Sequence, residues 1–81
     1  MRVIQELPVN HIYLDRVPLV PQTLDLVRHL ENGGSVPPIH VVKDVSGWRV
    51  LDGRHRLAAY RLLGRERILV RFGTSVSIQN V

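Results

Sequence analysis

A strand-like segment runs into a helix-like segment through a single glycine in the stretch VLDGRHRLAAYRLLG, at residues 50–64. Before Gly53 the chain is apolar enough for a strand, and after it apolar residues recur three and four positions apart, as on one face of a helix. Gly64 stands where this helix is expected to end, because glycine readily takes the left-handed conformation that follows helix C-termini. A short chain that turns directly from strand to helix is expected to be an α/β (α+β) domain built on one sheet.

Further strand-like segments lie on both sides of this corner. Residues 3–9 alternate apolar and polar side chains up to Pro8, and residues 11–14 are a second short extended piece. Two β-branched runs within residues 39–52 flank the turn sequence DVSG and predict a β-hairpin. Residues 67–72, RILVRF, predict a closing strand, whose arginines suit either a basic strip or a solvated sheet edge.

A first helix is predicted from Pro21 to just before Gly33, since proline is favoured in a first turn and glycine after a helix end. Its apolar residues have helical spacing: Leu24, Val27 and Leu30. The predicted order of elements is β-α-β-β-α-β. We expect a single small mixed-sheet domain over residues 1–73, followed by a C-terminal tail at residues 74–81.

Length and composition exclude several classes of protein. A chain of 81 residues has room for one small core. It contains no cysteine, which excludes disulfides, thiolate metal sites and thiol catalysis. No apolar run approaches the ~18 residues of a membrane helix, and the N-terminus lacks the apolar core of a signal peptide. We therefore expect a soluble cytoplasmic protein with no membrane partner.

Positive charge is concentrated in the C-terminal half. Residues 1–45 carry four basic and five acidic side chains, whereas residues 46–81 carry seven arginines against two acidic residues. The planar guanidinium of arginine suits phosphate groups. This distribution favours an anionic partner, such as a nucleotide or DNA, for the half that contains the corner.

A helical wheel assigns orientations to the residues of the second helix. The face expected to pack on the sheet is formed by His55, Ala58, Ala59 and Leu62. Arg54 and Arg61 fall on the opposite side and are expected to face solvent. Arg56 falls on the flank between sheet and solvent.

The start of this helix has the features of an anion site. The first turn of a helix leaves amide N–H groups unpaired, and the helix dipole makes that end positive. Gly53 would let a phosphate approach the backbone closely, and His55 and Arg56 could donate hydrogen bonds to it. Asp52 would repel a phosphate unless it acts through Mg²⁺ or as a base.

Each of these residues also has a purely structural interpretation. Asp52 is a good helix N-cap, and Gly53 is compatible with a simple tight turn. His55 on an apolar face fits a core histidine bonded to the backbone, and Arg56 fits a solvated flank. Trp48 fits core packing as well as stacking on a base.

Residues 37–72, PPIHVVKDVSGWRVLDGRHRLAAYRLLGRERILVRF, resemble the core of the ParB/sulfiredoxin superfamily, including the ParB-like N-terminal domains that are also described as ParB-like nucleases. The shared features are a Pro-Ile strand, a short hairpin, a Gly-x-x-Arg-x-x-Ala corner, and a glycine that ends the helix before a last apolar strand. The match extends more loosely to residues 6–15 and 23–34.

The resemblance implies a nucleotide-binding corner, since ParB proteins bind and hydrolyse CTP there, sulfiredoxins use ATP and archaeal free-serine kinases use ADP. Gly53 matches the family glycine and Arg56 the phosphate-binding arginine. The sequence DGRHR is similar to the Asp-Gly-His-His-Arg of the kinases, which implies a phosphate role for His55 and a metal or base role for Asp52. Arg54 lies within the same motif.

Some positions depart from the family pattern. Arg54 replaces the cysteine of sulfiredoxins, so reduction of sulfinic acids is excluded, and it replaces an acidic residue usual in ParB. Asp15 is the only second carboxylate that the loop after the first strands offers to a kinase-like site. A partitioning ParB continues into a helix-turn-helix, which is not found here, so we expect a free-standing or excised domain.

The function expected from these features is binding of CTP, ATP or ADP with Mg²⁺, together with nucleotide hydrolysis or phosphoryl transfer. The expected nucleotide-binding residues are Gly53, Arg54, His55 and Arg56, with Asp52 as the catalytic and metal-binding residue. The alternative is a DNA-associated binding or nuclease module that uses the arginine-rich half.

Overall fold

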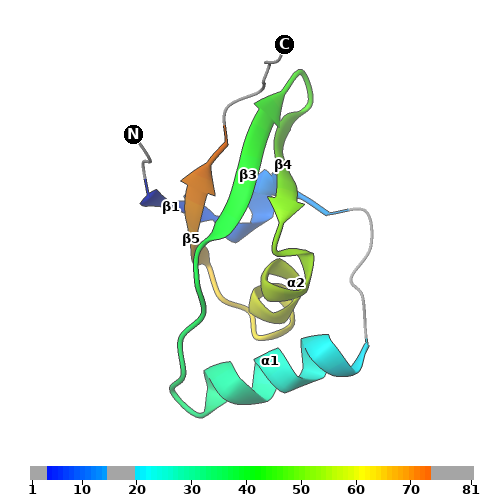
Figure 1. The fold of residues 1–81 in the computed structure, drawn as a ribbon, viewed down its shortest axis with the longest axis vertical. Coiled ribbons are helices and arrows are strands. Elements are labelled where there is room, and N and C mark those ends of the chain that lie inside the picture. Colours follow the sequence, from blue (N-terminus) through cyan, green and yellow to red (C-terminus); the bar gives the residue numbers. More distant parts are fainter. Residues whose placement is uncertain (1–3, 15–19, 74–81) are drawn as a thin grey trace.

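The computed structural model describes residues 4–14 and 20–73. Their elements in chain order are β1 (Ile4–Pro8), the 3-10 turn η1 (Val9–His11), β2 (Ile12–Tyr13), α1 (Pro21–Glu31), β3 (Ile39–Asp44), β4 (Gly47–Asp52), α2 (Arg54–Leu62) and β5 (Arg67–Phe72) (Figure 1). The predicted order is confirmed, and the short extended piece predicted after the first strand is β2. The expected tail and the segment around Asp15 lie outside the described residues.

The five strands form one mixed sheet in the order β1-β5-β3-β4-β2. The hairpin of β3 and β4 is antiparallel, β5 pairs parallel with β3 and antiparallel with β1, and β2 pairs parallel with β4. The α/β class and the mixed sheet expected from the sequence are therefore confirmed. The sheet-edge interpretation of the closing strand was wrong, because β5 lies inside the sheet with a partner on each side.

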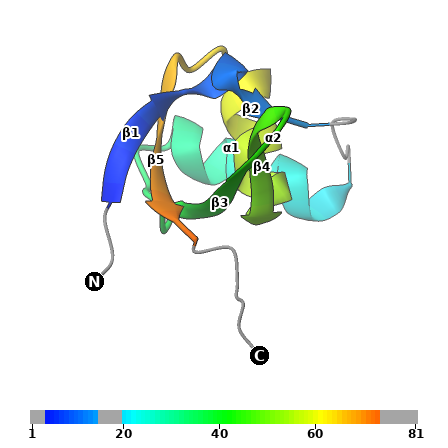
Figure 2. The ribbon, with the colours of Figure 1, turned by 90° about the horizontal axis from the view of Figure 1, so that it is seen from above.

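The helices lie on one side of the sheet as two successive layers. Figure 2 shows the strands curving around the helices, and Figure 1 shows α1 beneath α2, on the side away from the hairpin. The main core cluster joins the inner face of the sheet to Leu57 of α2, and its fully buried strand residues include Ile39, Val41 and Val70. Because α2 packs between the sheet and α1, its position is fixed, and with it the position of the β4–α2 corner.

The wheel assignment of α2 needs two corrections. Leu57 is fully buried, whereas Leu62, which was expected on the packed face, is 47% exposed. Arg61 does not simply face solvent, because its Nη2 donates to the carbonyl oxygen of Ile12 at 2.6 Å. The first difference arises because Leu57 is the residue of α2 that joins the core cluster on the sheet, and the second because the chain at Ile12 lies within reach of Arg61.

The hairpin and helix ends follow local sequence closely. The Asp44 carboxylate accepts a hydrogen bond from the backbone N–H of Ser46 at 2.8 Å, and Gly47 takes a positive φ to close the two-residue turn. Gly64 follows α2 with φ 69°, as predicted for a residue after a helix end. Within residues 4–14 and 20–73, no helix has the length and apolarity needed to cross a membrane.

Candidate functional site

The corner between β4 and α2 depends on the backbone of Gly53. Its φ of 113° and ψ of 24° lie in the left-handed region. A Cβ at this position would lie 2.6 Å from Cγ2 and 2.8 Å from Cβ of Ile39, a fully buried core residue. The glycine is therefore required both by its conformation and by close packing of the corner on β3.

The start of α2 has no side-chain cap. Gly53 is the N-cap residue, and its carbonyl accepts the N–H of Leu57 at 2.9 Å. The prediction that Asp52 caps the helix was wrong, because Asp52 is the last residue of β4 and lies one position too early. The first three helical positions, Arg54, His55 and Arg56, therefore present their amides at a positive helix end that carries basic rather than acidic side chains.

Arg56 holds the corner together rather than lying on a solvated flank. Its Nη1 donates to the carbonyl oxygens of Pro37 at 3.1 Å and Pro38 at 3.0 Å. Its Nη2 donates to the carboxylate of Asp52 at 3.1 Å, and the Arg56 side chain is only 19% exposed. Three of its five N–H donors are thus directed to the chain leading into β3 and to the end of β4, which leaves donors for a ligand.

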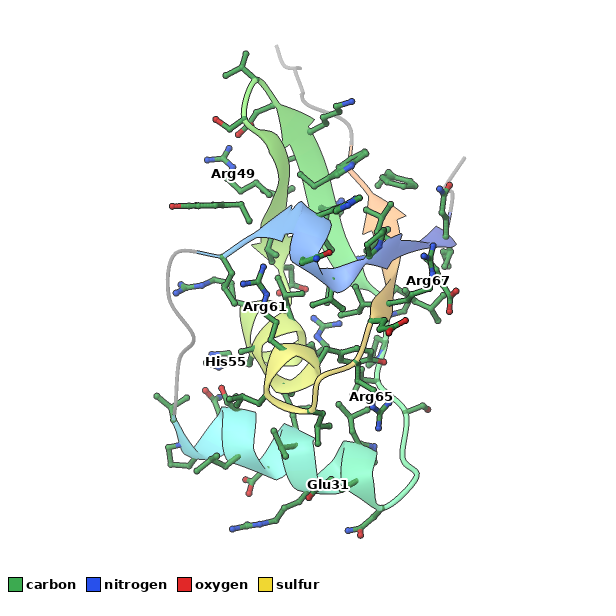
Figure 3. All side chains as sticks on the ribbon, turned by 180° about the vertical axis from the view of Figure 1, so that it is seen from behind. Glu31, Arg49, His55, Arg61, Arg65 and Arg67 are labelled. Carbon is green, nitrogen blue, oxygen red and sulfur yellow. The ribbon has the colours of Figure 1, made fainter. Side chains whose placement is uncertain are left out.

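His55 connects the corner to α1. Its Nδ1 lies 3.0 Å from the hydroxyl oxygen of Thr23, and Thr23 is fully buried. Which of the two atoms donates depends on the histidine tautomer. His55 projects from the first turn of α2 beside the start of α1 (Figure 3). It is half-buried, and its partner is a side chain rather than the backbone acceptor that the core interpretation expected.

All five predicted site residues line one open groove. Its volume is ≈ 510 Å³, and its walls are formed by Leu26, Val36, Pro37, Leu51 and residues 52–56. Arg54 is exposed, as predicted, and among the described residues it has no hydrogen bond or ion pair. A second open hollow of ≈ 490 Å³ shares Leu26 and His55 with this groove and continues along α1.

The contributions of α1 and of the proline pair to the site were not predicted from the sequence. Thr23 lies 32 positions before its partner His55, and no local pattern links the two. No site role was predicted for Pro37 and Pro38, although their carbonyl oxygens accept hydrogen bonds from Arg56. Local periodicity contains no signal for such long-range contacts.

The described residues do not form a resident metal site. Within them, no group of three or more His, Asp or Glu side chains is arranged to hold a metal ion. Among the described residues, Asp52 is the one carboxylate that lines the groove, and its side chain is 73% exposed. One carboxylate fits Mg²⁺ only when phosphate oxygens and water supply the remaining ligands.

Comparison with known proteins agrees with this architecture. The mixed five-stranded sheet with two helices is the fold of the ParB/sulfiredoxin superfamily. The model of the ParB N-terminal domain family matches residues 1–80, so this chain belongs to that family. Among curated proteins, no sequence matches the chain.

Three solved structures have similar folds. Sulfiredoxin from Arabidopsis thaliana is 25% identical with a TM-score of 0.72, and the match covers 88% of this chain and 84% of that one. C-terminally truncated ParB from Caulobacter crescentus, complexed with CTP-gamma-S, is 15% identical with a TM-score of 0.73 over 94% and 47% of the two chains. A Pnob8-like ParB-N domain is 17% identical with a TM-score of 0.69 over 89% and 30%. The chain thus spans about half or less of the two ParB structures.

Proposed function

We propose that this domain binds the phosphates of a nucleotide in the groove at the β4–α2 corner. The observation that carries the proposal is the uncapped start of α2, where the positive end of the helix carries Arg54, His55 and Arg56 and no acidic residue in its first turn. This arrangement is unfavourable for an isolated helix, and an anion that accepts the free amides would relieve it. The ParB structure with bound CTP-gamma-S supports a nucleotide as the source of that anion.

The residues of the corner have distinct roles in this proposal. The amides at the start of α2 and the exposed guanidinium of Arg54 contact phosphate oxygens. Arg56 keeps the proline carbonyls in place and uses its remaining donors on the same phosphates. In the tautomer in which the Thr23 hydroxyl donates to Nδ1, His55 carries its proton on Nε2 and donates from there to a phosphate oxygen.

Asp52 is proposed to act once a nucleotide is bound. Mg²⁺ carried by the phosphates would take one ligand from its exposed carboxylate and would reduce the repulsion between carboxylate and phosphate. Hydrolysis or phosphoryl transfer at this site is part of the same proposal. Asp52→Asn separates binding from turnover, because it removes the charge while keeping the size of the side chain.

A titration panel tests binding directly. Isothermal titration with CTP, ATP and ADP, each with Mg²⁺, is expected to give binding for at least one nucleotide. Arg54→Gln is expected to weaken it by roughly tenfold, since a hydrogen bond to a charged group is worth ~1.5 kcal/mol or more. Arg28→Gln is the matched control, because Arg28 is an exposed arginine on α1 that pairs with Asp25. No binding at millimolar nucleotide, or equal losses in both variants, would contradict the proposal.

Thr23 is expected to position His55 for binding. Thr23→Val removes the hydroxyl, so Nδ1 loses its buried partner and the preference for the Nε2 proton weakens. We expect nucleotide affinity to fall about fivefold, the equivalent of one hydrogen bond of ~1 kcal/mol. Thr23→Ser should restore it. The ¹⁵N shifts of the His55 ring should report the tautomer, and unchanged shifts in Thr23→Val would show that Thr23 serves packing alone.

The alternative of a DNA-associated or nuclease module has less structural support. Of the seven arginines in the C-terminal half, five interact with acceptors in the chain itself: Arg49, Arg56, Arg61, Arg65 and Arg67. The charge excess that suggested DNA is therefore not a set of free cations, although the exposed contacts of Arg65 and Arg67 are weak. We place the nucleotide first because its groove contains unpaired donors that converge on one corner.

A further inference from the structure

A separate hollow, distinct from the corner groove and from the hollow along α1, lies at the opposite end of α2 from the corner. Its volume is ≈ 590 Å³, larger than the corner groove, and it opens where η1 faces the loop between α2 and β5. Its lining residues are Pro8, Val9, Asn10, Arg61, Gly64, Arg65, Glu66 and Arg67. Since α2 has nine residues at ~1.5 Å each, about 13 Å of helix separates the two sites. Among the described residues, this hollow and the corner groove have no lining residue in common.

The lining of this hollow is strongly basic. Among the residues that the structure describes, three arginines line it against a single carboxylate, that of Glu66. Figure 3 shows these arginines coming from the last turn of α2, the following loop and the start of β5. Cations near a helix C-terminus stabilise the helix, which accounts for Arg61 and Arg65 in part. It does not account for Arg67, which belongs to a strand.

Arg61 is a partly buried cation without a counterion among the described residues. Its Nη2 donates to the Ile12 carbonyl oxygen, but its Nε is buried and has no hydrogen-bond partner within residues 4–14 and 20–73. In the same residues no carboxylate pairs with it. A desolvated charge is unfavourable unless it is paired, so an anion in the adjoining hollow would stabilise it.

The other two arginines can turn toward an anion at small cost. Arg65 is exposed, makes one long contact of 3.4 Å with the Leu30 carbonyl oxygen and stacks 5.8 Å from the centre of the Tyr60 ring. Arg67 is half-exposed and pairs with Glu6 at 3.3 Å. Exposed pairs of this kind contribute little to stability.

From this combination we infer a second, independent anion site that takes a phosphate group. A phosphate group carries negative charge on several acceptor oxygens, which suit the forks of several arginines around one hollow. The phosphate belongs either to a nucleic acid strand or to a small phosphorylated molecule. This site does not depend on nucleotide binding at the corner.

Residue-resolved NMR of the ¹⁵N-labelled chain tests the proposal with inorganic pyrophosphate and, separately, with a short single-stranded DNA. We expect the amides of Asn10 and of residues 64–67 to shift as one group with its own saturation curve. Residues 53–56 form a second group that reports on the corner alone. Binding at one site can therefore be detected even where the other site shows none. A response to DNA only, weakening steeply with salt, identifies a nucleic acid as the source. A response to pyrophosphate identifies a small ligand.

Two variants that each lose one positive charge are compared for binding at residues 64–67. Arg65→Gln is expected to weaken binding at residues 64–67 by about tenfold, the typical effect of losing one charge-assisted contact. Arg49→Gln removes the same charge from an exposed position on β4 and should leave this binding unchanged. Circular dichroism of both variants should show the native fold. The proposal is overturned if residues 64–67 respond to neither probe, or if both variants weaken binding equally.

Discussion

Replacing Gly53 with alanine is expected to destabilise the domain by about 2–5 kcal/mol. The left-handed conformation of this residue costs ~1–2 kcal/mol for a side chain with a Cβ. The new Cβ would also overlap Ile39, and overpacking a core typically costs ~1–3 kcal/mol. Urea unfolding followed by circular dichroism measures the sum. For a chain of 81 residues, this is a large share of a total stability of roughly 5–10 kcal/mol.

Gly47 provides a matched control for the two contributions. It has a similar positive φ of 118°, but a Cβ there would meet nothing within 4 Å. Gly47→Ala should therefore show only the conformational cost, and the difference between the variants isolates the overlap with Ile39. Equal destabilisation by the two substitutions would show that the corner relaxes around the new methyl group. The close approach of Gly53 to β3 would then not be what requires glycine.

Arg56→Ala is expected to produce the largest combined loss of stability and nucleotide affinity. The guanidinium links Pro37, Pro38 and Asp52 and is mostly buried. Hydrogen bonds to a charged group contribute ~1.5–3 kcal/mol, so we expect a loss of that order in the free energy of unfolding. If its remaining donors also hold phosphate, affinity should fall by roughly ten- to a hundredfold. Unfolding and titration of the same preparation measure both.

Comparison with other variants separates the two roles of Arg56. Arg54→Gln should lower affinity without lowering stability, because the Arg54 side chain is exposed and has no partner among the described residues. Arg56→Lys keeps the charge but cannot reach three acceptors with a planar fork, so it should recover affinity better than stability. Should Arg56→Ala lower stability and leave affinity intact, Arg56 would be a structural clamp only.

The elements of this fold were largely predictable because their signals are local. Pro21 and Gly64 mark helix ends through fixed backbone preferences, and the turn between β3 and β4 is closed by Asp44 and Gly47. The grouping of residues 52–56 at one groove was also predictable, since neighbours in sequence at a single corner cannot lie far apart.

Long-range packing accounts for the errors. Leu62 and Arg61 were misplaced because the wheel could not show which face of α2 the sheet would cover or which distant carbonyl oxygen would lie within reach. A solvated edge was left open as one alternative for the closing strand because its arginines gave no sign that β1 would pair beside it. Charges on one face of a strand do not reveal whether its edges are paired, because the hydrogen-bonding edges lie perpendicular to the side chains.

The sequence by itself determined the order of elements, the glycine at the corner and the basic residues at the start of α2. Only the tertiary structure decided what those residues contact. The pairing of Thr23 with His55, and of Arg56 with the carbonyl oxygens of Pro37 and Pro38, joins segments 18–32 positions apart. Such contacts form because the core brings α1, β3 and α2 together, and a hydrogen bond then forms wherever a donor and an acceptor meet away from water. Secondary-structure propensity acts over a few residues and therefore does not predict contacts between distant segments.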